Sequence, residues 1–355
     1  AEHRFGPERP SIKVVAIGGG TGLSTLLRGL KKHDLAITAI VTVADDGGST
    51  GRIRSEFDIP APGDIRSCLV ALADDESLVG RLFQYRFDQE GSQLAGHSFG
   101  NLFITALTRV TGSFEQAVSE TASVLAIRGR VLPSTLENVT LSATLVDGTT
   151  LRGESSIAKK HCAIKNVFLE PGHPSGYEPA LSAILNADLI VLGPGSLYTS
   201  VLPNLHVAGI TQALRWSPAP KVYVCNVATQ PGETDHMDAA EHIQTMLDHV
   251  GERFLDLALV NSNPASARAI TPKAPIEPIT PVGLDHLRGK VRIVSKDVVS
   301  DVNPLRHDPE KLARALLEIL HATPTGEKSA ASIPRLVSVP VSQSRQLAGS
   351  PGAKE

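Results

Sequence analysis

The sequence contains few cysteines and few aromatic residues, and both shortages narrow the class of protein. Among its 355 residues are three cysteines and one tryptophan, and aromatic side chains make up 4% of the chain. Cys68, Cys162 and Cys225 are far apart and form no C-x-x-C pair, so neither a disulfide framework nor a zinc site is indicated. This cysteine usage fits a reducing compartment, and we expect a cytoplasmic protein.

Long apolar runs and a strong net charge are also missing. No apolar stretch approaches the ~20 residues that cross a bilayer. Lysine and arginine number 34 against 37 aspartates and glutamates, for a formal net charge of −3, so nothing in the charge indicates a nucleic-acid partner. A composition of 41% hydrophobic and 20% charged residues is typical of a soluble globular protein with ample chain for a core.

A run of glycines between two apolar segments is the most informative feature that is present. Residues 18–22 read Gly-Gly-Gly-Thr-Gly, an apolar stretch at 12–17 precedes them, and leucines follow at helical spacing: Leu23, Leu26, Leu27 and Leu30. The pattern predicts a buried strand, a tight turn and a helix. Because glycines let backbone N–H groups approach an anion, and the first helical turn adds roughly half a positive charge, we expect an anionic ligand here.

Two known phosphate-binding motifs do not fit these glycines. Neither register of the run supplies the third glycine of G-x-G-x-x-G, and no Gly-Lys-Ser/Thr follows, since Lys31 and Lys32 lie at the far end of the helix. The loop therefore favours nucleotide or phosphate binding without NAD or Walker-type ATP chemistry. The alternative is that the glycines only permit close packing of strand against helix.

The rest of the chain alternates short apolar runs with helix-length segments. Each run precedes small polar residues, and the runs lie at 37–43, 189–192, 222–225 and 257–260. This rhythm predicts a Rossmann-like α/β fold with a mostly parallel, doubly wound sheet in a single domain over residues 12–322. The carboxyl ends of such strands border the ligand crevice, so we expect one site there.

Other segments depart from this rhythm. Apolar residues alternate from Val139, and Asp147-Gly148 is a hairpin signal, so we expect an antiparallel β insertion around 131–170. Asp64 is expected to cap a helix through Leu72, and a closing helix is expected at 309–322. Segments 1–11 and 323–355 are expected to be flexible tails.

Polar residues that follow the second predicted strand are candidates for ligand contacts. Asp45 and Asp46 lie near the place where a Rossmann acidic residue holds a ribose hydroxyl, and next to a diphosphate they are also candidate Mg²⁺ ligands. The alternative is an Asx turn before the glycines. Arg52, Arg54 and Arg66 are each able to pair with phosphate oxygens or to form surface ion pairs.

Two later segments add candidates. His97 and Asn101 begin a helix after a loop, where a histidine can act as general acid or base or be a hydrogen-bonded loop residue. Ser196 lies in Gly-Pro-Gly-Ser-Leu-Tyr, which is not a nucleophile elbow. We expect its hydroxyl, with Tyr198 and Thr199, to bind phosphate or base.

Read together, these motifs resemble the YvcK family of bacterial gluconeogenesis factors, in the superfamily of 2-phospho-L-lactate transferase. The segments that carry the resemblance are 18–24, 44–52, 62–66, 96–101 and 193–200. The resemblance implies a cytoplasmic protein that binds UDP-N-acetylglucosamine or a related UDP-sugar and supports cell shape and envelope synthesis during gluconeogenic growth. It implies no established reaction. A protein partner in envelope synthesis and a homo-oligomer are both compatible with it.

The resemblance also implies site residues. Gly19, Gly20, Thr21 and Gly22 would hold the diphosphate, and Asp45, Asp46, Ser49 and Thr50 the ribose, sugar or metal. Arg52, His97 and Asn101 join the predicted ligand-binding set, and the later strand ends would close the pocket with Gly195, Ser196, Tyr198, Asn226, Thr229 and Gln230. Asn226 and Thr229 are the candidates that read the uracil edge.

The transferase branch of the superfamily gives the rival hypothesis. It implies transfer from a GDP-activated donor to a deazaflavin, with Mg²⁺ held by aspartates. This chain instead has the small loop Gly47-Gly48-Ser49-Thr50-Gly51-Arg52, which offers little aromatic surface to stack a flavin-like ring. The sequence does not identify partners, oligomeric state or phosphorylation sites.

Overall fold

The main feature of the structure, a computed structural model, is a seven-stranded parallel sheet in the order β10-β9-β8-β7-β1-β2-β3. The structure describes residues 11–74, 78–89, 91–160, 162–251, 254–263 and 276–322, so the two expected tails lie outside it except for Ser11. The strands are β1 Ile12–Gly18, β2 Leu35–Val41, β3 Arg130–Pro133, β7 Leu189–Leu192, β8 Lys221–Val224, β9 Leu257–Asn261 and β10 Arg292–Lys296.

The central strands are apolar along their whole length because both faces of the sheet are covered. β1 pairs in parallel with β2 on one side and with β7 on the other. Val14 to Ile17 and Leu189 to Leu192 are buried throughout, as expected for a parallel sheet between two helical layers. The predicted α/β fold with a mostly parallel, doubly wound sheet is confirmed.

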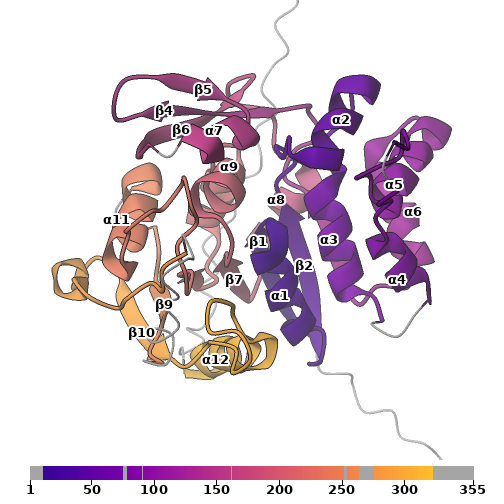
Figure 1. Ribbon diagram of the computed structural model, residues 1–355. Coiled ribbons are helices and arrows are strands. Elements are labelled where there is room, and N and C mark those ends of the chain that lie inside the picture. The colour runs from indigo at the N-terminus through magenta and orange to yellow at the C-terminus, as the bar shows by residue number, and fades with distance from the viewer. Residues whose placement is uncertain are drawn as a thin grey trace, which may run out of the picture. The chain divides into compact units, whose positions relative to one another are not determined.

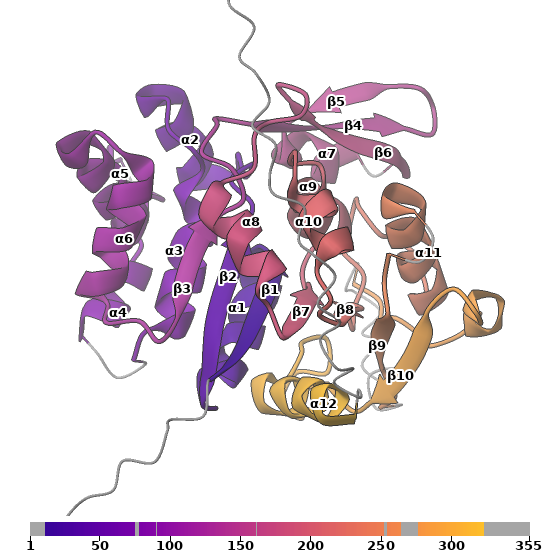
Figure 2. The same ribbon diagram turned by 180° about the vertical axis from the view of Figure 1, so that it is seen from behind.

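Helices lie on both faces of the sheet. Figures 1 and 2 show α1 and α3 on one face and α8 and α10 on the other. The α-helices are α1 Gly20–Leu30, α2 Gly48–Phe57, α3 Pro62–Leu72, α4 Leu78–Gln84, α5 Phe99–Thr111, α6 Phe114–Val124, α7 Glu154–Lys160, α8 Glu178–Leu185, α9 Leu202–Leu205, α10 Ile210–Trp216, α11 Ala239–Val250 and α12 Pro309–Ala322. Two short helical turns are η1 Leu197–Val201 and η3 Leu284–Leu287. No helix in the described ranges is long and apolar enough to span a membrane.

A second, antiparallel sheet interrupts the α/β rhythm, with the order β5-β4-β6. Its strands are β4 Thr140–Leu145, β5 Thr150–Arg152 and β6 Ile164–Glu170. In Figure 1 it lies at the same end of the molecule as α2. Ser155, at the start of α7, donates its N–H to Asp46 Oδ1 at 2.9 Å, so the insertion is bound to the loop after β2.

Two edge strands were not expected from the sequence. β3 lies within the segment expected to be the insertion, yet it pairs in parallel with β2, and the antiparallel strands begin only at Thr140. β10 reads Arg-Ile-Val-Ser-Lys and is partly exposed along its length. A strand with polar residues at both ends and one free edge lacks the continuous apolar run that marked the central strands.

Candidate functional site

The predicted site lies at the topological switch point of the sheet, between β1 and β7. In the sheet, β2 and β3 lie on one side of β1, and β7 to β10 lie on the other. Gly193, just after β7, donates its N–H to Ile17 O at 2.8 Å and holds the two carboxyl ends together. Ligands of open α/β sheets bind outside the carboxyl ends of the strands at this kind of position.

For the glycines that follow β1, the structure shows the packing role that the sequence left open, and their binding of an anion stays a prediction. Gly19 is the N-cap of α1 and has no side chain of its own to cap the helix, and Gly20 has a φ of +63°, a conformation that favours glycine. A Cβ on Gly22 would lie 2.6 Å from the carbonyl oxygen of Pro194, so this glycine is required by close packing of two backbones. The turn therefore combines the partly positive amino-terminal end of α1 with a packing constraint.

Asp64 lies directly beneath this turn. A Cβ on Gly19 would lie 2.3 Å from Asp64 Oδ2, and the Asp64 carboxyl accepts a hydrogen bond from the N–H of Gly20. Burial and the neighbouring charge of Asp45 raise the pKa of Asp64 to about 7. The prediction that Asp64 caps its own helix is wrong, because α3 begins at Pro62 with Ala61 as N-cap and Asp64 is already inside the first turn.

Three further carboxyl groups line the same end of the sheet. Asp45 Oδ1 accepts the N–H of Gly47 at 2.8 Å, and burial raises the pKa of Asp45. Burial also raises the pKa of Glu154 well above its usual value, with the charges of Asp45, Asp64 and Glu233 acting in the same direction. We name Asp45, Asp64, Glu154 and Glu233 the carboxyl group cluster.

The hydroxyls of the β7 end contact this cluster. Ser196 Oγ donates to Glu233 Oε2, and Thr199 Oγ1 lies 3.4 Å from Glu233 Oε1. A hydrogen bond with the Thr199 side chain lowers the pKa of Glu154, against the larger effect of burial. Glu154 and Glu233 were not predicted from the sequence; Glu233 lies close after the polar end of β8, whereas nothing in the sequence marks Glu154, which the insertion supplies.

The predicted Mg²⁺ ligands point to different partners. Asp46 accepts Ser155 N–H, whereas Asp45 accepts Gly47 N–H and a hydrogen bond from Thr50. In the part of the chain that the structure describes, no group of three or more His, Cys, Asp or Glu residues is arranged to hold a metal ion. Because Mg²⁺ is usually held by one or two carboxylates together with phosphate oxygens and waters, Asp45 suits an ion carried by a diphosphate ligand rather than a site formed by protein alone.

Ser49, Thr50, His97 and Asn101 form a connected polar group, and each is buried. Ser49 Oγ lies 3.1 Å from His97 Nδ1, and Asn101 Nδ2 donates to Ser49 Oγ at 3.3 Å and to Thr50 Oγ1 at 3.4 Å. Asn101 Oδ1 has no hydrogen-bond partner among the described residues. A buried acceptor without a partner is costly, which makes it a candidate contact for a ligand N–H or O–H group.

Several predicted residues of the later strand ends make internal contacts. Asn226 holds the backbone of Gly195 through both atoms of its amide, at 2.8 and 3.1 Å. Thr229 bonds the backbone of Glu277 through its own N–H and through its hydroxyl. Their assignment to the uracil edge stays a prediction, and the structure gives both residues a clear role in positioning the loops.

Tyr198 and Gln230 take different positions around this end. Tyr198 lines a pocket of about 320 Å³ beside α11 together with Met237, Glu241, Gln244, Thr245 and His286. Gln230 donates its N–H to Thr234 Oγ1, and its side-chain Oε1 is enclosed and meets no hydrogen-bond donor in the part of the chain that the structure describes. Gln230 therefore has a free acceptor, as Asn101 does.

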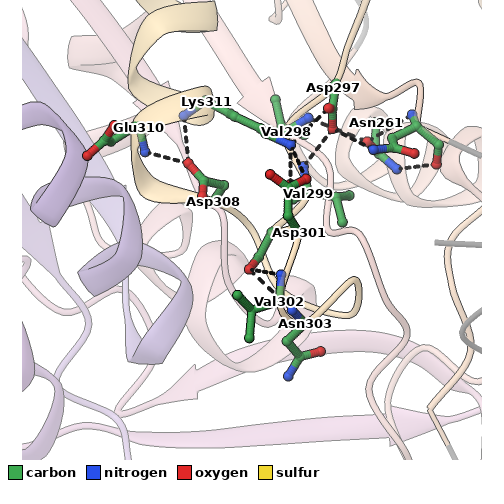
Figure 3. A network of polar contacts seen from close by, with 12 residues as sticks. Asn261, Asp297, Val298, Val299, Asp301, Val302, Asn303, Asp308, Glu310 and Lys311 are labelled. Atoms are coloured by element: carbon green, nitrogen blue, oxygen red, sulfur yellow. Dashed lines mark hydrogen bonds and ion pairs between the residues drawn. The ribbon is translucent and has the colours of Figure 1, made fainter. Parts of the chain in front are cut away.

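Arg306 is a cation at the glycine turn that sequence reasoning missed. Its Nη1 donates to Thr21 Oγ1 at 3.2 Å, across 285 residues of sequence. Figure 3 shows the polar network that holds this segment: Lys311 Nζ bonds Asp297 Oδ2 at 2.9 Å and Asp301 Oδ1 at 2.7 Å. Arg306 thus supplies a positive charge where the sequence led us to expect an anion.

Two of the predicted arginines have less direct roles. Arg54 donates to the carbonyl oxygens of Ala44 and Asp45 at 3.1 Å and to the side chain of Asn138, so it ties the loop after β2 to the insertion. Arg52 donates to Ala95 O at 2.7 Å, in the segment before α5.

Comparisons with known proteins agree with this geometry. The sequence profile of the family described as 2-phospho-L-lactate transferase CofD matches residues 14–301. Gluconeogenesis factors from Halalkalibacterium halodurans and Bacillus subtilis are 49% and 47% identical to this chain; the alignments cover 86% and 87% of this chain and 95% and 98% of those proteins. The crystal structure of a UPF0052-family protein from Bacillus halodurans matches with a TM-score of 0.81 and 48% identity, over 87% of this chain and 99% of that one. The chain therefore belongs to the 2-phospho-L-lactate transferase CofD family, in its group of gluconeogenesis factors, the YvcK or UPF0052 family.

Proposed function

We propose that this protein binds a UDP-sugar, UDP-N-acetylglucosamine, at the switch point and acts as a cytoplasmic regulator that supports cell shape and envelope synthesis during gluconeogenic growth. The observation that carries the proposal is the start of α1 at Gly20, where the N-cap Gly19 has no side chain of its own, with Arg306 beside it at Thr21. Backbone N–H groups, the helix dipole and a guanidinium together suit a diphosphate. In this role the ligand-bound form contacts a protein partner of envelope synthesis.

The carboxyl group cluster supports a ligand rich in hydroxyls. Carboxylates accept hydrogen bonds from hydroxyls, and the enclosed acceptors of Asn101 and Gln230 need donors. The sugar and the ribose of a nucleotide sugar supply such donors next to the diphosphate. The amide of an N-acetyl group supplies another.

A second function has its own support. The family includes 2-phospho-L-lactate transferase, and carboxyl groups with raised pKa values are typical of catalytic sites. The alternative is therefore a transferase that uses a GDP-activated donor with Mg²⁺ bound through Asp45. It differs from the first proposal in the base and in the fate of the ligand.

Replacement of Arg306 tests the first proposal. Loss of a charge-assisted hydrogen bond to phosphate costs about 1.5–3 kcal/mol, so Arg306→Gln should weaken UDP-N-acetylglucosamine binding by about tenfold or more in calorimetric titration. Arg292→Gln, on the exposed edge strand β10, is the matched control and should bind as the unmodified protein does. Equal affinity in both variants would remove Arg306 from the site, and tighter binding of GDP than of the UDP-sugar would favour the transferase.

A further inference from the structure

Two arginines bind the backbone of one short segment that precedes α5. Arg52, from α2, donates from Nη2 to Ala95 O at 2.7 Å, and Arg86 donates from Nη1 to Gly96 O at 2.6 Å. A Cβ on Gly96 would lie 3.2 Å from Arg52 Nη2. The two guanidinium groups are therefore anchored to adjacent carbonyls.

A third arginine reaches the same region from α3. A Cβ on Gly100 would lie 2.7 Å from Arg66 Cδ, so the Arg66 side chain packs on the first turn of α5. Its Nη2 donates to Ser67 Oγ at 3.0 Å, and its enclosed Nε has no hydrogen-bond partner within the described ranges. We name Arg52, Arg66 and Arg86 the arginine cluster.

Among the residues that the structure describes, no carboxylate pairs with an arginine of the cluster. In the described ranges none of the three arginines forms an ion pair. Burial and the charge of Arg86 lower the pKa of Arg66, and the charges of Asp64 and Asp45 oppose this only in part. Positive charges that lie close together repel one another, and an anion that binds between them reduces this repulsion.

Hydrogen-bond donors from the neighbouring helices complete the surroundings. His97, 9% exposed, follows Gly96, and its Nδ1 lies 3.1 Å from Ser49 Oγ. Burial, Arg52 and Arg86 lower the pKa of His97, and Glu56 opposes them. Both α2 and α5 begin in this region, and their amino-terminal ends add partial positive charge.

We propose that the arginine cluster binds the oxyanion of a second, small acidic ligand, a carboxylate or a phosphoryl group, beside the proposed nucleotide site. Planar guanidinium groups bind such oxyanions through paired hydrogen bonds. Hydrogen bonds connect His97 to Ser49, Ser49 to Asn101 and Thr50, and Thr50 to Asp45, so the second ligand would lie on the side of the carboxyl group cluster. Two ligands held side by side are the arrangement that a group transfer requires.

The test uses His97 as the reporter in the full-length protein. The histidine side-chain resonances are followed by NMR during titration with inorganic phosphate and, separately, with succinate, and His97→Asn assigns the signal. We expect a saturable shift of the His97 signal with at least one probe and a rise in its pKa, because a nearby anion stabilises the imidazolium. The absence of a saturable shift with both probes would overturn the proposal.

Matched variants locate the anion. Arg52→Gln combined with Arg86→Gln should weaken the effective probe by about tenfold or more, whereas Arg109→Gln, an exposed arginine at the far end of α5, should leave binding unchanged. Equal weakening in the Arg109 variant would contradict a defined site. Thermal unfolding of each variant checks that it is folded. The NMR titration of the unmodified protein tests the proposal even if a variant fails to fold.

A titration in saturating UDP-N-acetylglucosamine separates one ligand from two. We expect the probe to bind with unchanged affinity, which shows an anion site distinct from the diphosphate site. Competition would overturn the proposal, because the arginine cluster would then hold the diphosphate itself. If the nucleotide sugar does not bind at all, the proposed function fails while the phosphate or succinate titration still decides this inference.

Discussion

At the scale of single residues, the site is dominated by carboxyl groups that burial keeps from ionising easily. The pKa values of Asp45, Asp64, Glu154 and Glu233 are all raised, in each case with burial as the largest cause. Asp64, with a pKa of about 7, is in part protonated at neutral pH and able to donate a hydrogen bond. A cation, or a hydroxyl-bearing ligand, is the natural partner of such a cluster.

The raised pKa of Asp64 makes the free energy of unfolding depend on pH, and the direction of that dependence follows from the pKa. Its pKa is about 7 in the folded protein against 3.8 in an unfolded chain, so the unfolded state loses the proton more readily. The free energy of unfolding should therefore fall as the pH rises from about 4 to about 7. Asp64→Asn should flatten this fall, as measured by urea unfolding between pH 5 and pH 8.

The other carboxyl groups act in the same direction, so the variant should reduce the slope rather than abolish it. An Asp64→Asn protein with the same slope as the unmodified chain would contradict the assigned pKa. Asp188→Asn, in which the replaced carboxyl group only accepts the backbone N–H of Lys13 far from the site, is the matched control and should keep the original slope.

Residue roles were predictable from the sequence only where they depend on local structure. The glycines at 19, 20 and 22 and the aspartate at 45 could be placed at the carboxyl ends of strands because they follow strands closely in the sequence, and their ligand contacts stay predictions. Arg306 and Glu154 could not, since each reaches the site through tertiary contacts with segments far away in the sequence. The capping role expected for Asp64 was wrong because Pro62 begins the helix earlier.

At the scale of elements, the segment between β10 and α12 is held by one lysine. Lys311 Nζ bonds the carboxylates of Asp297 and Asp301 and the carbonyl oxygen of Val299, and the charges of both aspartates raise the pKa of Lys311 (Figure 3). Arg306 lies within this segment. The network therefore positions the cation that faces the glycine turn.

Lys311→Met should release that segment. We expect a loss of about 1 kcal/mol or more in the free energy of unfolding, together with weaker nucleotide-sugar binding, because Arg306 would no longer be fixed. Lys296→Met, which removes an exposed ion pair with Glu318, is the control and should cost under about 0.5 kcal/mol without changing affinity. Unaltered affinity in the Lys311 variant would show that the network has no role in the site.

Which elements could be predicted depends on their burial. β1, β2, β7, β8 and β9 have continuous apolar runs because both faces are covered, and all were expected close to their observed bounds. β3 and β10 are the edge strands and carry polar residues, so periodicity alone did not show them. The hairpin at Asp147-Gly148 was predictable from its turn chemistry and is present between β4 and β5.

At the scale of the whole described fold, the switch point and the insertion act together. The switch point places the ends of β1 and β7 side by side, while the insertion brings Glu154 to the same end and is joined to the β2 loop through Asp46 and Ser155. The switch point and the insertion thus bring residues from both halves of the chain to the same end of the sheet. It suits a ligand with a diphosphate at one end and hydroxyls at the other.

The most direct test of the central claim is a calorimetric titration of the whole protein with UDP-N-acetylglucosamine, with and without Mg²⁺, followed by recovery of the nucleotide. We predict saturable binding of one ligand per chain, tighter than that of GDP, and recovery of the nucleotide sugar intact. Cleavage of the recovered ligand would make the protein an enzyme rather than a regulator. Binding of GDP without binding of the UDP-sugar would contradict the account.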